Sequence, residues 1–76
     1  MTNAPSLMPK EAKILRILAN DPAKAHSLGD LKHMMNQSGF ENALASLARR
    51  RLIEMPLESA MITKRGLGAI TLHDAG

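Results

Sequence analysis

The sequence contains no cysteine, tryptophan or tyrosine, and Phe40 is its only aromatic residue. The lack of cysteine excludes disulfide bonds and thiolate metal sites, and it is compatible with a reducing cytoplasm, where we expect the protein. With one aromatic ring, the core has to be aliphatic, supplemented by some of the six methionines. No apolar run approaches the roughly 20 residues of a membrane-spanning helix, so we expect no membrane contact.

Patterns typical of catalysis are also missing. His26, His33 and His73 show no metal-ligand spacing and have no clustered carboxylates beside them. No set of serine, histidine and aspartate resembles a nucleophilic site, and no glycine loop would cradle a phosphate. We therefore expect no enzyme activity, no metal and no cofactor.

The chain has 76 residues, which predicts one domain, and 45% of them are hydrophobic, which is enough for a core. Its net charge of +3 favours anionic partners without identifying one. The N-terminus has neither a basic start nor an apolar stretch, so it does not resemble a signal peptide. We predict a flexible arm at residues 1–8, one domain at residues 9–71, and a tail at residues 72–76 that frays.

The segment that begins at Ser38 is predicted to form the central helix of the domain. Ser38 is expected to cap a helix, because Glu41 three positions later can reach back to its amide. The apolar stripe of this helix follows helical spacing and consists of Phe40, Ala43, Leu44 and Leu47. The opposite face carries short and polar side chains, and Arg49, Arg50 and Arg51 stand at the helix exit. Such a helix suits groove reading, and an ordinary solvated surface helix is the alternative interpretation.

Two further helices precede this segment. Residues 10–19 follow Pro9 and form an amphipathic helix with a stripe of Ile14, Leu15, Ile17 and Leu18. Residues 23–26 are a connector or a short edge strand. Ser27 caps the second helix, whose predicted buried stripe is Leu28, Leu31, Met34 and Met35. The second helix, the polar turn after it and the central helix together predict a helix-turn-helix.

The hydrophobic period changes after the third helix. Residues 52–55 and 60–63 predict two short strands, and residues 56–59 predict the turn between them. Thr63 is expected to cap a last helix that runs through Ile70. The predicted fold is thus mainly α with a small β-hairpin wing, an α+β class.

Several segments resemble winged helix-turn-helix regulators. Ala43-Leu44, Leu47 and Leu52-Ile53 resemble their recognition helix and first wing strand, and residues 62–70 are similar to the motif after the wing in the MarR and PadR groups. The resemblance implies a three-helix winged helix-turn-helix domain and a small transcriptional regulator whose third helix enters the major groove of double-stranded DNA. We expect a monomer or a weak homodimer.

The sequence departs from this pattern at the helix exit and at the wing. Arg51 stands where a glycine usually closes the helix in a left-handed conformation, so we expect either a strained arginine or a different helix end. The wing turn carries Glu58 and no lysine or arginine. An acidic wing favours the alternative of a winged-helix protein-interaction module that does not bind DNA.

The candidate DNA contacts combine base-reading and phosphate-binding chemistry. Asparagine pairs with adenine and arginine with guanine, whereas lysine and helix N-termini suit phosphates. The candidates are Gln37, Ser38, Asn42, Ser46, Arg49, Arg50, Lys32, Lys64 and Arg65. Ordinary surface charge is the alternative interpretation of the lysines and arginines.

Overall fold

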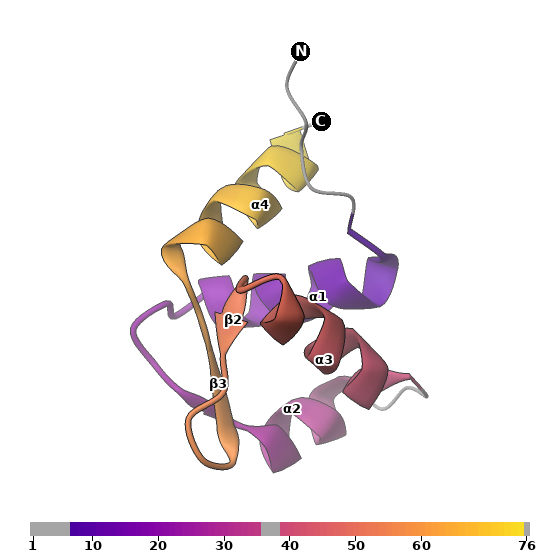
Figure 1. Cartoon of the computed structure of the whole chain (residues 1–76), viewed down its shortest axis with the longest axis vertical. Coiled ribbons are helices and arrows are strands. Elements are labelled where there is room, and N and C mark those ends of the chain that lie inside the picture. The colour runs from indigo at the N-terminus through magenta and orange to yellow at the C-terminus, as the bar shows by residue number, and fades with distance from the viewer. Residues whose placement is uncertain (1–6, 36–38, 76) are drawn as a thin grey trace.

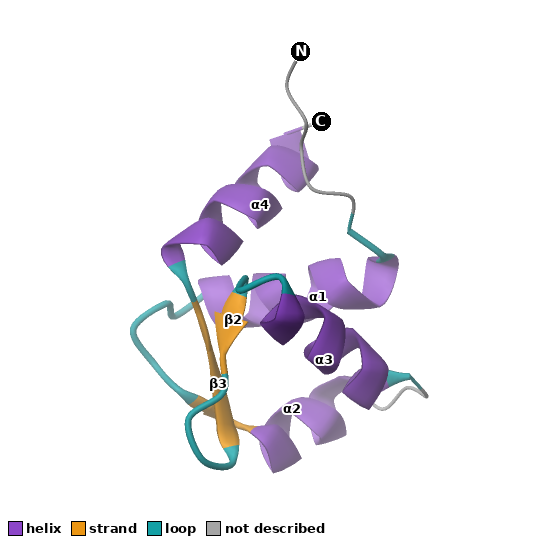
Figure 2. Cartoon of the chain, in the orientation of Figure 1, coloured by secondary structure: helices purple, strands orange, loops and turns teal. Residues whose placement is uncertain are grey.

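The computed structural model describes residues 7–35 and 39–75. These residues form four helices and a small antiparallel sheet (Figures 1 and 2). In chain order the elements are α1 (Pro9–Ala19), β1 (His26–Ser27), α2 (Leu28–Met35), α3 (Phe40–Arg49), β2 (Ile53–Glu54), β3 (Ser59–Ile62) and α4 (Lys64–Ala75). The predicted α+β class with a hairpin is confirmed at this level. Gln37 and Ser38 lie outside the described residues.

The strands form a three-stranded sheet in the order β1-β3-β2. The hairpin pairs Ile53 with Ile62, and β1 pairs His26 with Ala60 on the other side of β3. Of the two interpretations of residues 23–26, the edge strand is present only at their end, because β1 covers His26–Ser27 and residues 23–25 are a connector. The Leu28 amide donates to the Glu58 carbonyl at 2.9 Å, which fixes the hairpin turn against the start of α2.

The core is aliphatic, as the composition requires. All four predicted stripe residues of α3 are buried, and Ile14, Leu15 and Leu18 of α1 are completely buried. In α2 the prediction is wrong for Met34, which is 49% exposed. Leu31 and Met35 are four residues apart and point inward together, whereas Met34 is turned by 100° to the flank of this short helix.

Both ends of the domain extend beyond the predicted boundaries. Leu7, which was predicted to belong to the flexible arm, is buried in the core cluster. At the other end, α4 does not stop at Ile70 but continues to Ala75. Arg16 of α1 donates to Asp74 at 2.6 Å, and this ion pair joins the last turn of α4 to the domain.

Two helix boundaries depend on left-handed backbone. Gly39, with φ of 84°, is the N-cap of α3, so the predicted cap at Ser38 is one residue too early. A positive φ suits glycine, which has no β-carbon to clash. Arg51 has φ of 60°. This left-handed conformation confirms the strained arginine, the first of the two alternatives that we expected for the end of this helix, at a position where winged helix-turn-helix sequences usually have glycine. Its conformation is one that bulky residues adopt at an energetic cost.

The cap of α4 is the predicted one. The Thr63 hydroxyl accepts from the Gly66 amide at 3.0 Å and donates to the Arg51 carbonyl at 2.8 Å. The Thr63 amide donates to the Leu52 carbonyl at 3.1 Å. These bonds hold the exit of α3 directly against the entry of α4.

Candidate nucleic-acid interface

The outward face of α3 carries polar side chains in the middle and at the exit of the helix. Asn42, Ala45 and Arg49 are exposed, on the side of the helix opposite the buried stripe. Asn42 offers an amide that can both donate and accept, and Arg49 offers a planar guanidinium. Two of the predicted base contacts are therefore presented to solvent.

Ser46 and Arg50, two other predicted contacts, are turned toward α1 instead. Arg50 lies 2.8 Å from the carboxylate of Glu11, which is only 4% exposed, and the Ser46 hydroxyl also bonds this carboxylate. The Met8 amide donates to the same group at 2.8 Å. Glu11 thus joins the start of α1 to the flank of α3, and Ser46 and Arg50 stabilise the fold through it.

Hydrogen bonding controls the ionisation of Glu11. Burial alone would raise the pKa of this carboxyl group, but bonds from Ser46, the Met8 amide and Arg50 outweigh burial and lower the pKa. The charged form is therefore favoured in the folded chain. A carboxyl group whose pKa is depressed by folding stabilises the protein above its unfolded pKa, and this stability disappears as the pH falls through the folded pKa.

We expect the Glu11→Gln variant to be less stable than the wild type at pH 6–7 by about 1.5–3 kcal/mol, the usual contribution of hydrogen bonds to a charged group. Below pH ~4.3, the ordinary value for glutamate, the difference should shrink and then vanish. Urea unfolding at several pH values measures it. A constant difference down to pH 2 would contradict the assigned role of the charge.

The exit of α3 and the entry of α4 together form what we name the basic junction, which consists of Arg49, Arg51, Lys64 and Arg65. All four side chains are exposed, and none forms an ion pair with the described part of the chain. The bonds of Thr63 to the Arg51 carbonyl and to Gly66 hold its two halves together. Sequence analysis had noted the run of three arginines at the helix exit, but it did not include Arg51 among the candidate contacts.

Lys32, the remaining predicted contact, is not part of this junction. It is exposed on α2 and lines a groove together with Glu41 of α3. The structure therefore brings Lys64 and Arg65 together with the exit of α3, and it places Lys32 on a different surface.

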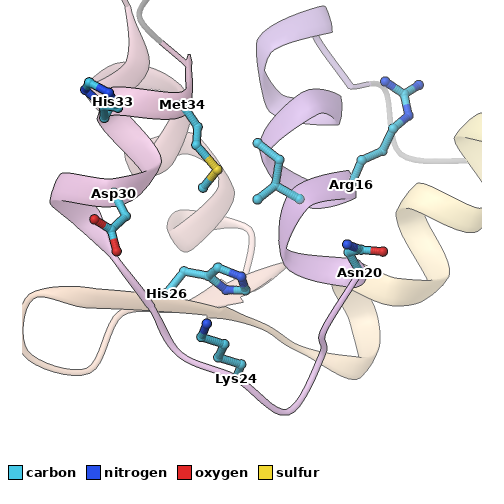
Figure 3. Close-up of a pocket in the computed structure, with 8 residues that line it drawn as sticks. Arg16, Asn20, Lys24, His26, Asp30, His33 and Met34 are labelled. Carbon is cyan, nitrogen blue, oxygen red and sulfur yellow. The ribbon is translucent and has the colours of Figure 1, made fainter.

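A cleft of about 700 Å³ lies between α1, the connector to β1, and α2 (Figure 3). His26, Met34 and Arg16 are among the residues that line it, and the guanidinium of Arg16 points away from the cleft, consistent with its ion pair to Asp74. The Nδ1 atom of His26 is buried and has no hydrogen-bond partner among the described atoms. No group of three or more potential metal ligands occurs within residues 7–35 and 39–75.

The chain matches no protein-family model, no curated protein and no solved structure. Among the helices that the structure describes, none has the length and hydrophobicity needed to cross a membrane. Any assignment of function must therefore rest on the chain's own residues.

Proposed function

We propose that this protein is a small winged helix-turn-helix regulator that binds double-stranded DNA. The basic junction carries the proposal, because its four exposed cations adjoin the polar outward face of α3. The order of the elements supports it, since a helix, a helix-turn-helix pair and a hairpin follow one another and the hairpin packs beside α2. We place the protein in the cytoplasm, as a monomer or a weak homodimer.

The two kinds of side chain have different roles in this proposal. Asn42 and Arg49 face outward from α3 and read base edges in the major groove. Arg51, Lys64 and Arg65 bind phosphates, which position the helix and carry no sequence information. Lys32 adds a phosphate contact from α2. Ser46 and Arg50 make no direct DNA contact in this proposal, because both side chains bond the carboxylate of Glu11.

We expect Arg49→Ala to weaken binding to a preferred duplex and to reduce discrimination at one base pair by roughly 1–3 kcal/mol. Lys64→Ala and Arg65→Ala should instead weaken binding to all duplexes similarly. They should also reduce the slope of log affinity against log salt, because each phosphate contact releases counterions. Fluorescence anisotropy over a salt series, with a duplex selected from a random pool, measures both effects.

Glu58→Ala is the matched control for charge. It removes a carboxylate from the hairpin tip and should leave binding unchanged or slightly stronger, because it removes like-charge repulsion near the DNA backbone. Equal and small effects of Arg49→Ala, Lys64→Ala and Arg65→Ala would show that α3 does not read bases. The absence of saturable binding to any duplex at physiological salt would contradict the proposal as a whole.

A protein-interaction module is the second candidate function. Leu57, at the tip of the hairpin, is 98% exposed, and Glu58 follows it. A large apolar side chain next to a carboxylate suits a protein surface better than a phosphate backbone. This candidate predicts no saturable duplex binding, together with loss of a protein partner when the same surface is changed.

A further inference from the structure

A groove between α2 and α3 has no role in the proposed DNA contacts, apart from Lys32 at its edge. Its volume is about 490 Å³. Its lining is mostly apolar and consists of Leu28, Gly29, Lys32, Phe40, Glu41, Leu44, Ala45 and Met55. The groove is thus formed by residues of α2 and α3, together with Met55, which directly follows β2.

The tip of the hairpin lies next to one end of the groove. Met55 lines it from the start of the turn, and Leu28 lines it from α2 while its amide donates to the Glu58 carbonyl. Between Met55 and Glu58 stands Leu57, which is almost fully exposed and has φ of 54°. Glycine or asparagine would adopt this left-handed backbone more easily. Neither burial nor backbone conformation therefore accounts for a leucine at this position.

The charge around this surface is negative, although the chain as a whole carries +3. Glu41 lines the groove, and Glu54 and Glu58 flank the exposed part of the hairpin. All three are exposed, and none forms an ion pair within the described part of the chain. Among the described residues that line the groove, Lys32 is the one cation. The surface therefore complements an apolar segment with basic flanks, and Lys32 is the lining residue that it shares with the proposed phosphate contacts.

We propose that this groove, together with Leu57, binds a basic amphipathic helix of a partner protein. A groove between two helices accepts a third helix through anchors at positions i, i+3 or i+4, and i+7. Lysines or arginines beside these anchors would face Glu41 and Glu58. The described part of the chain does not supply such a helix itself, because the apolar stripe of its basic helix α1 is buried in the core. The proposal holds whether or not α3 reads DNA.

The probe is a synthetic 14-residue leucine-lysine peptide with helical periodicity, titrated into the ¹⁵N-labelled full chain. We expect saturable shifts of the amide signals of Leu28, Ala45, Met55 and Leu57, and little change in the basic junction. Leu57→Asn, which suits the left-handed backbone, should weaken binding at least tenfold. The Glu41→Gln/Glu58→Gln double variant should weaken binding and flatten its salt dependence.

Two controls separate this site from general adhesion. Leu72→Asn removes another exposed leucine, on α4, and should bind the peptide like the wild type. A leucine-glutamate peptide of the same periodicity should not bind. Several outcomes would overturn the proposal: unchanged affinity of Leu57→Asn, binding of the acidic peptide, or shifts confined to the cleft between α1 and α2. The proposal would also be overturned if the amide signals of the groove residues shifted with protein concentration alone. The same holds if duplex DNA shifted these signals and the peptide did not.

Discussion

Replacing Leu47 with alanine should lower the free energy of unfolding by about 2–5 kcal/mol, the usual range for a leucine truncated in a core. Leu47 is completely buried and lies on the inward stripe of α3. Small domains have a total stability of roughly 5–15 kcal/mol, so this single change removes a large share. Urea unfolding followed by circular dichroism measures the shift in the midpoint.

Leu72→Ala is the matched control for Leu47→Ala. It removes the same atoms from a leucine of α4 that is 47% exposed, so we expect a change of less than about 1 kcal/mol. If the two variants unfold at the same urea concentration, the inward stripe of α3 has been placed on the wrong side of the helix.

The sequence predicted the stripe of α3 completely because periodicity reports the direction of the core directly. Phe40, Ala43, Leu44 and Leu47 are spaced so that all four point to one side. The short helix α2 carries less information, because either Met34 or Met35 can continue the stripe from Leu31 at helical spacing. Periodicity could not choose between Met34 and Met35. In the structure Met35 is buried in the core, whereas Met34 borders the cleft between α1 and α2.

In the candidate site, too, the sequence predicted the orientation of some residues and not that of others. The outward orientation of Asn42 and Arg49 follows from the position of the apolar stripe of α3 alone. Ser46 and Arg50 lie on the flank of α3, and whether a neighbouring helix covers that flank depends on tertiary packing. Their partner Glu11 precedes them by more than thirty positions, and no local pattern links residues so far apart. The two ends of the domain were misjudged for the same reason, because a long-range ion pair of Asp74 and the packing of Leu7 against the core extend it.

Replacing Gly66 with alanine should destabilise the protein by about 3 kcal/mol or more, at or above the usual cost of overpacking. A β-carbon at this position would lie 2.0 Å from the Leu52 carbonyl oxygen and 2.8 Å from Cγ1 of Ile62. The carbonyl belongs to backbone that also accepts the Thr63 amide, so it cannot move away cheaply. The entry of α4 would therefore have to separate from the exit of α3.

Gly68→Ala tests whether this effect is steric. It makes the same chemical change two residues later in α4, where a β-carbon would meet nothing within 4 Å. Alanine is the better helix former, so we expect this variant to be more stable than the wild type by about 0.5–1 kcal/mol. Thermal and urea unfolding of both variants should thus give shifts of opposite sign. Shifts of the same sign and size would mean that the contact between Gly66 and Leu52 does not hold the two halves of the basic junction together.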